Sequence, residues 1–363
     1  MARNRVIYQS EALYVSEEAN STAVGNHKQL QRVQSANYSF NISRQDINQF
    51  SSLARIDSIA LEAPTVAFDT SYYLGDGFNE GVLGFANSDF TVGFASGHMT
   101  PTSGKNLFIV TADEGIDAIS QTTEAGTMPV IGLGNAYLTD YTVDASVGSI
   151  PTVSVSFEAA NINAVTDASG SSAGYSGIEI PSIEQADGTK LTSDVALPAA
   201  TTGVGNVTAL RPGDVTVSFG TAGNDAIVNI ADSSDGAHVQ SASLSLSMSR
   251  SPLERLGSRF PFARTVDFPV NASLSVSAIV NEITAENLAD TIDSTNGIDI
   301  TLTFKDAGES SEVCKYQLKN ARLESESFSS SIGSNKTVDL TFSTQIGGPS
   351  DTDNNIFFSG TNS

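Results

Sequence analysis

Two segments of this sequence occur twice, in the same order, once in each half of the chain. Residues 33–44 and 239–250 both open with Val-Gln-Ser-Ala, alternate apolar with polar side chains and close on Ser-Arg. A second pair begins at Leu133 and Leu318, and the Gly-Ser that follows each lies at the same offset (318 − 133 = 185 and 333 − 148 = 185). A solenoid repeats every 20–50 residues or so, which is far too short a period. The repeat therefore predicts two whole domains produced by duplication.

The chain of 363 residues is long enough for two domains of ordinary size. We expect a first domain over 1–160 and a second, its internal repeat, over 206–363. Residues 161–205 differ in character, being rich in Ala, Ser, Gly, Thr and Asp. We interpret them as a polar insertion or linker that projects outward or bridges to a neighbouring assembly.

Strict alternation of apolar and polar side chains indicates β-strands, because successive residues of a strand point to opposite faces. The apolar rows run from Ala36 to Ile42 and from Ala242 to Met248. The opposite rows are small, neutral and hydroxylated or amidic: Ser35, Asn37, Ser39, Asn41 and Ser43; Ser241, Ser243, Ser245, Ser247 and Ser249; and Asn271, Ser273 and Ser275. The expected fold is mainly β, with two tandem β-sandwich or barrel domains.

Each domain is expected to carry one short flanking helix, over 283–292 in the second half and around 113–119 in the first. Between the paired strands, each copy has a connection whose apolar residues predict a helical turn or a loop that docks on a neighbouring subunit. Those residues are Ile47, Phe50, Leu53, Leu253 and Leu256. The tail from Gly347 is expected to be loosely ordered, with residues 356–358 available to another subunit.

The charge and the cysteine content exclude several classes of protein. A net charge of −23 argues against sequence-independent binding to the outside of DNA, which requires Lys and Arg to neutralise phosphates. Cys314 is the single cysteine, so no intrachain disulfide or Cys-based metal site is expected. The N-terminal residues do not form a secretory signal, and no apolar run reaches membrane-spanning length. We expect synthesis in a cytoplasm and no membrane partner.

Signals for catalysis are weak. The three histidines lack a metal-binding spacing, and no nucleophile elbow, Walker loop or Rossmann glycine pattern occurs in a strand–helix context. Several carboxylates leave a glycoside hydrolase open: Asp113, Glu114, Asp140, Asp144, Glu309, Glu312, Glu324 and Glu326. The absence of Trp argues against a carbohydrate enzyme. We predict that the protein is not an enzyme and binds no cofactor or metal.

Residues 34–50, 59–66 and 71–74 resemble the major tail proteins, or tail tube proteins, of tailed bacteriophages, in the form with a duplicated domain. The resemblance lies in layout: paired long strands with a docking connection, then further strands and a flanking helix. It covers most of the chain outside roughly 160–205. The second copy departs from the first where Ser251-Pro252 replaces Gln45-Asp46.

This resemblance implies a structural virion protein, made in the host bacterial cytoplasm and located in the virion tail. Three such chains would form a pseudo-hexameric ring, and stacked rings would form a tube through which double-stranded DNA passes during genome ejection. The polar rows above would then line the lumen. The partners implied are further copies of the chain, the tail terminator, the tip or baseplate and, in contractile tails, a sheath.

A second hypothesis is a surface or capsid-decorating β-domain protein that binds a receptor or glycan. That hypothesis requires exposed aromatic residues, and Tyr72-Tyr73 and Phe357-Phe358 are its candidates.

Overall fold

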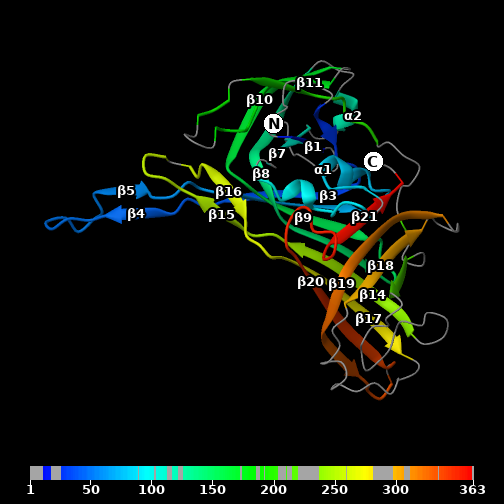
Figure 1. Cartoon of the computed structure of the whole chain (residues 1–363). Coiled ribbons are helices and arrows are strands. Elements are labelled where there is room, and N and C mark those ends of the chain that lie inside the picture. Colours follow the sequence, from blue (N-terminus) through cyan, green and yellow to red (C-terminus); the bar gives the residue numbers. More distant parts are fainter. Residues whose placement is uncertain are drawn as a thin grey trace.

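The computed structural model describes residues 11–17, 26–88, 90–101, 104–112, 117–121, 126–171, 174–184, 189–191, 193–202, 210, 215–219, 237–258, 260–280, 297–305, 311–333 and 335–361. The chain is mainly β, as the alternating pattern predicted, and its long strands pair antiparallel (Figure 1).

Three groups of elements follow one another along the chain. The first group is β1 (Ala12–Glu17), β2 (Lys28–Gln29), β3 (Val33–Phe40), β4 (Arg44–Ile47), β5 (Asp57–Ala60), β6 (Val66–Tyr73), α1 (Phe78–Leu83), the 3-10 helix η3 (Ser96–His98), β7 (Lys105–Val110), α2 (Ala118–Gln121), β8 (Gly126–Ser146) and β9 (Thr152–Ala159). The second is β10 (Asn161–Ser171), β11 (Gly174–Glu179) and β12 (Asp194–Leu197). The third is β13 (Val215–Phe219), β14 (Ala237–Ser247), β15 (Arg250–Leu253), β16 (Ala263–Val266), β17 (Val270–Val280), β18 (Ile298–Lys305), β19 (Glu312–Ser329), β20 (Thr337–Ile346) and β21 (Ile356–Gly360).

The first and third groups share one scheme of strand pairing. In the first group β3 pairs with β6, β6 with β9 and β9 with β8. In the third group β14 pairs with β17, β17 with β20 and β20 with β19. The long strands β8 and β19 each begin on a different sheet partner, β7 or β18, which in turn pairs with β1 or β13. Registers also correspond, since Phe68 lies opposite Phe157 and Leu274 opposite Phe342.

The repeated sequence motifs mark backbone positions that need a left-handed conformation. Asn135 and Asn320 have φ angles of 52° and 53°, and each lies at the bend of its long strand. Asn tolerates this region better than most residues with a Cβ. Gly148 and Gly333, in the turns that follow, have φ angles of 86° and 89°. The residues repeated at the offset of 185 are thus the ones that shape the two long strands and their turns.

A single sheet runs through both halves because β14 pairs with the second part of β8, with Ser243 opposite Asp144. We call this β8–β14 pairing the seam. The sheet order is β3-β6-β9-β8-β14-β17-β20-β19. Its two outer strands are β3 at one end and the second part of β19 at the other. One apolar cluster with members from both halves covers the inner face of the sheet.

The C-terminal segment is ordered against its own chain, contrary to the expectation of a loose tail. β21 pairs with β19, and Phe357 and Phe358 are 1% and 0% exposed. The Phe358 ring packs on Phe94 of the first half, with centroids 5.5 Å apart. The tail was therefore misassigned because its partner strand is close in space but not apparent from the local pattern. Residues 356–358 are not available to another subunit.

Residues 161–205, which were expected to be a polar insertion or a linker, include strands that pair with the first half. β10 pairs with the first part of β8, and β11 and β12 continue the sheet from β10. Tyr175, Ile178 and Leu197 from this segment join Tyr14 and Phe108 in a second apolar cluster. Several of the few apolar residues in this polar segment thus point to one side, whereas Ile162 packs against the first cluster. The overall composition of the segment conceals this.

The connections inside the strand pairs are β-hairpins rather than helical turns. β4 pairs with β5 and β15 pairs with β16, and both hairpins extend beyond the sheet to the left in Figure 1. Residues at the bases of both hairpins, among them Ala63 and Pro252, line one cavity of about 120 Å³. We call these two hairpins the arms.

The helices are short. α1 was not anticipated, and α2 overlaps only the end of the helix expected around 113–119. The helix expected over 283–292 lies outside the described residues. Within the described part of the chain, no helix has the length and apolar character needed to cross a bilayer.

Candidate functional site

The polar rows singled out from the sequence lie, as far as Ser39 on β3 and Ser247 on β14, on one face of the eight-stranded sheet, opposite the apolar cluster. Asn41, Ser43 and Ser249 follow the ends of those strands. We call this surface the polar face. Ser35 on β3 hydrogen-bonds Ser71 on β6 at 2.6 Å, and Ser245 on β14 hydrogen-bonds Ser273 on β17 at 2.7 Å. The rows of β14 and β17 are in register, and Ser247 lies opposite Asn271. The remaining residues of these rows are half-buried or exposed: Asn37, Ser39, Asn41, Ser43, Ser241, Ser243, Ser249 and Ser275.

Carboxylates from neighbouring strands complete the polar face. Ser156 donates to Asp69 at 2.6 Å, and Ser243 donates to Asp144 across the seam at 2.5 Å. Asp140 lies opposite Ser247 on the same face. Asp140 and Asp144 were noted from the sequence as part of a possible catalytic cluster, whereas Asp69 was missed. The structure distributes these groups along an open surface that is dominated by hydroxyls and negative charge.

Two further members of the proposed carboxylate cluster each contact a neighbour of their own. Glu324 accepts a hydrogen bond from Ser343 at 2.5 Å, and Glu312 pairs with its neighbour Lys315. Residues 113, 114 and 309 lie outside the described part of the chain.

The two outer strands of the sheet expose apolar side chains that their counterparts at the seam bury. Tyr38 on β3 is 42% exposed, whereas its counterpart Leu244 on β14 is 2% exposed. Phe328 on β19 is 45% exposed, whereas its counterpart Val143 on β8 is 0% exposed. These outer strands also lack a hydrogen-bonded neighbour on one side within the described chain. An edge of this kind is a template for pairing with another strand.

The arms carry the apolar residues that were proposed to dock on a neighbouring subunit. Phe50, Leu53 and Leu256 are fully exposed, and Ile47 and Leu253 are 36% and 40% exposed. None of them is part of the two apolar clusters of the described chain.

Arginines hold the β15–β16 arm against the sheet. The Arg250 guanidinium lies 4.7 Å from the centre of the Tyr137 ring, and Arg264 forms an ion pair with Glu158. Burial lowers the pKa of Arg250 to about 10. A cation over an aromatic face is a favourable contact, so the base of this arm is fixed while its tip is solvated.

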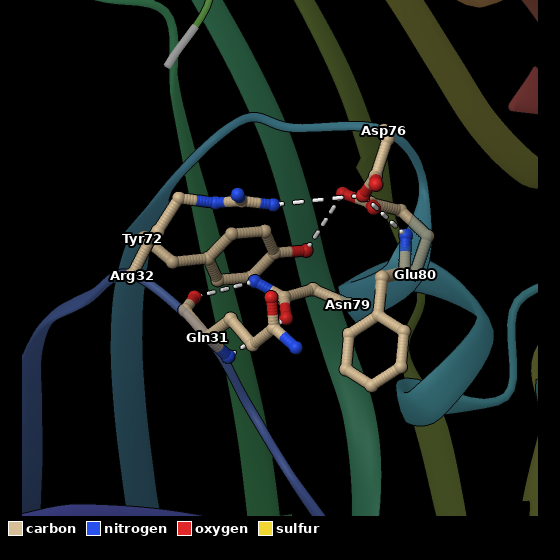
Figure 2. Close-up of polar contacts among 7 residues, drawn as sticks. Gln31, Arg32, Tyr72, Asp76, Asn79 and Glu80 are labelled. Atoms are coloured by element: carbon tan, nitrogen blue, oxygen red, sulfur yellow. Dashed lines mark hydrogen bonds and ion pairs between the residues drawn. The ribbon is translucent and has the colours of Figure 1, made fainter. Parts of the chain in front are cut away.

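Sequence reasoning missed a buried polar cluster around α1, shown in Figure 2. The Tyr72 hydroxyl donates to Glu80 at 2.9 Å, and Tyr141 donates to the same carboxyl oxygen at 3.2 Å. Burial raises the pKa of the Glu80 carboxyl. Tyr141 also hydrogen-bonds Tyr316 of the third group at 2.8 Å. The cluster therefore ties α1 to both halves of the molecule.

Two further contacts anchor α1 to the turn before β3 (Figure 2). The Asn79 side-chain amide donates to the backbone oxygen of Gln31 at 2.7 Å and accepts from its backbone nitrogen at 2.9 Å. Arg32 forms an ion pair with Asp76 at 3.5 Å. A helix of six residues is too short to be stable alone, so these contacts hold it in place.

Among the described residues, no three or more His, Cys, Asp or Glu side chains are grouped as a metal would require. His98 is buried, and burial lowers the pKa of its imidazole to about 3, so the ring is neutral at physiological pH. Tyr72 is fully buried, as are Phe357 and Phe358. The receptor-binding hypothesis thus loses three of its four candidate aromatic residues.

No protein-family model and no curated protein matches the chain. A solved structure similar to part of it is the cap of the anti-feeding prophage, described as the cap that terminates the tube and determined by cryo-EM. The two chains are 10% identical with a TM-score of 0.28, over 45% of this chain and 97% of that chain. A similarity of this degree leaves the function to be argued from the residues of the chain itself.

Proposed function

We propose that this chain is the tube subunit of a bacteriophage tail, a structural virion protein whose copies form rings that stack into a conduit for the genome. The observation that carries the proposal is the pair of open edges. A sheet that already joins two equivalent halves ends on two strands that expose Tyr38 and Phe328. Closing such a sheet through neighbouring copies removes both edges at once.

The shared pairing scheme supports two tandem copies of one domain. Strand order, register, the bend at Asn135 and Asn320 and the turn glycines all repeat in the two halves. Under this proposal, the first domain spans 1–160 and the second 206–363, and residues 161–205 form a layer added to the first.

A ring of three chains follows from the duplication. Each chain supplies eight strands to the common sheet, so three chains supply 24 (three times eight). With neighbouring strands about 4.8 Å apart, 24 untilted strands enclose a circle roughly 37 Å across between backbones, and strand tilt widens it. Such a ring has room for a DNA duplex after the lining side chains are counted.

The polar face suits the lining of that conduit. Hydroxyls and carboxylates such as Asp69, Asp140 and Asp144 dominate this face. Arg322, opposite Ser343, is a cation on it, so the duplex would meet few groups to which it could adsorb. The net charge of −23 acts in the same direction.

The arms suit contacts between successive rings. Phe50, Leu53 and Leu256 are exposed at positions beyond the sheet, where only another ring or a tail protein at the end of the tube could bury them. The partners proposed are thus further copies of the chain, the tail terminator and the tip or baseplate, with a sheath in contractile tails.

Electron microscopy of concentrated purified protein, beside a glycan-binding assay, tests this proposal. We expect rings or stacked tubes with an open centre. Discrete monomers that bind saccharide would contradict it and favour the receptor-binding hypothesis.

A further inference from the structure

Two grooves occupy equivalent places in the two halves. The first, which we call the β14 groove, is lined by Val215 and Val217 of β13 and by residues 239–242 of β14. The second, the β3 groove, is lined by residues 11–13, at and next to β1, and by residues 33–37. Residues 33–36 and 239–242 have the same sequence, Val-Gln-Ser-Ala, so the walls of the two grooves correspond.

The grooves differ in what fills them. The end of β8 and the residue that follows it, residues 145–147, line the β14 groove. The Val147 backbone nitrogen donates to the Gln240 oxygen at 2.9 Å. The space left open in that groove is about 30 Å³, whereas the β3 groove, which no such strand end among the described residues lines, has about 330 Å³. One groove is thus filled by a segment of the same chain, and its equivalent is open.

The offset of 185 identifies the counterpart of the filling segment as residues 330–332 (145 + 185 = 330 and 147 + 185 = 332). These residues follow β19 directly, at the other open edge of the sheet. Ile332 is 108% exposed, compared with 64% for its counterpart Val147. Within one chain, β3 and β19 are at opposite ends of the sheet. The segment that fits the β3 groove must therefore come from a second copy.

We propose that residues 330–332 of one copy occupy the β3 groove of the next, so that β19 pairs with β3 in the register of the seam. This inference rests on the proposed ring and specifies its contact. At the seam Ser243 lies opposite Asp144, and Leu244 opposite Val143. Translated to the open edges, these pairs become Asn37 opposite Ser329 and Tyr38 opposite Phe328.

This register matches the side chains on both faces. Tyr38 and Phe328, each exposed in the single chain, cover one another on the apolar face. A shift by one residue would set each of them opposite a residue whose side chain points to the polar face, because side chains alternate along a strand. At the end of the seam that follows Ser247, Thr139 and Arg250 line one cavity. Their counterparts are Glu324 and Arg44, which carry opposite charges.

Cysteine pairs test the register directly. At the seam, the backbone bonds from Val147 to Gln240 and from Met248 to Thr139 belong to the apolar-face pairs. Polar-face pairs are therefore not hydrogen-bonded to each other, and their Cα atoms are about 4.5 Å apart, within disulfide range. The test variant is Asn37→Cys with Ser329→Cys in the full chain. The matched control, Ser243→Cys with Asp144→Cys, has the same geometry within one chain.

A third variant, Asn37→Cys with Ser325→Cys, moves one partner by four residues along β19. Cys314 is 1% exposed, and burial raises the pKa of its thiol, so it should not interfere. After mild oxidation and denaturing electrophoresis, we expect covalent species up to the trimer from the test variant. The Ser243/Asp144 control should remain monomeric while losing two free thiols, and the shifted variant should not cross-link.

A separate substitution tests the filling segment. Ile332→Asp changes a fully exposed side chain, so the thermal unfolding of the monomer should not change. Assembly should require about tenfold more protein, because a buried apolar contact of roughly 1.4 kcal/mol or more is lost.

The outcomes separate the two proposals. In one outcome, microscopy shows rings and the seam control oxidises, but the test variant does not cross-link. This result would overturn the proposed register and leave the proposed tube function unaffected. Cross-linking of the shifted variant in preference to the test variant would do the same. A protein that neither forms rings nor cross-links would overturn both.

Discussion

At the scale of single residues, the chain uses a few side chains to fix positions that both halves need. Asn135 and Asn320 set the bends of the long strands, and the side chain of Asn135 also bonds the backbone of Ile183 at 2.8 and 3.2 Å. Glu80 is buried among tyrosine hydroxyls at the junction of the halves. These residues hold a large sheet in one shape.

Replacing Asn135 separates its two roles. We expect Asn135→Ala to lower the free energy of unfolding by about 3 kcal/mol, from roughly 1 kcal/mol for the left-handed backbone and about 1 for each of two hydrogen bonds. Asn135→Gly relieves the backbone cost and should lower it by about 2 kcal/mol. Urea denaturation of both variants measures the difference, and equal losses would show that the φ of 52° has no energetic role.

The pH dependence of stability should reveal Glu80. Its pKa is raised above 4.5, first by burial and also by the charge of Asp76, against hydrogen bonds that lower it. The folded state therefore holds a proton that the unfolded state releases near pH 4.5. As the pH rises above that value, the contribution of Glu80 to the stability of the folded protein decreases. Glu80→Gln keeps the acceptor for Tyr72 and removes the titration.

Thermal unfolding of wild type and Glu80→Gln from pH 4 to pH 8 measures this effect. The Tm of the variant relative to wild type should increase with pH. A Tm difference that stays constant over this range would mean that Glu80 does not titrate in the folded protein.

At the scale of elements, local alternation and non-local pairing contributed differently to what the sequence could predict. The period of two identified β3, β14 and β17 and the residues of the polar face, because each strand carries its own pattern. The seam could not be predicted. β8 and β14 are far apart in the sequence, and the pattern of neither strand identifies the other as its pairing partner. The same holds for β21, which was mistaken for a loose tail.

Short elements were missed for a different reason. α1 begins after Gly77 without a side-chain cap and ends at Gly84, so it has neither the length nor the capping residue that predicts a helix. The arms were expected to be a helical turn or a docking loop, from the spacing of their apolar residues. Those residues are instead exposed near the tips of hairpins, where no core imposes a period.

At Gly134 the two halves differ, because residues 161–205 pack closely on this position of the first half. A Cβ at this position would lie 2.3 Å from the carbonyl of Pro181, whereas the counterpart residue is Lys319. We expect Gly134→Lys to displace the layer formed by residues 161–205 and to speed proteolysis there. Lys319→Ala, which loses a bond to the Thr352 oxygen at 2.9 Å, is the matched control. Equal protease resistance in all three proteins would refute this role.

The tips of the arms should matter for stacking and not for folding. Phe50→Ser with Leu53→Ser changes two fully exposed side chains, so unfolding should shift by no more than about 0.5 kcal/mol per residue. Rings should still form, while tubes become shorter or disappear in electron micrographs. Tubes of normal length would show that this arm does not join rings. The same experiment with Leu256→Ser tests the other arm.

At the scale of the whole molecule, the account depends on the seam being a template for the contact between chains. Among the described residues, one chain contains the closed joint of β8 with β14 and two open edges, β3 and β19, that correspond to its two sides. The repeated motifs that predict a duplication were visible in the sequence through their offsets. The sheet that the two halves share could not be predicted, because it depends on the pairing of strands about a hundred residues apart in the sequence.

The rotational symmetry of the assembled ring tests this claim most directly. Cryo-EM of the purified tubes should give three-fold symmetry, with six similar domains around one continuous β-barrel and the polar face toward the lumen. A ring of six whole chains, a ring in which β3 remains unpaired, or a protein that stays monomeric at high concentration would contradict the account.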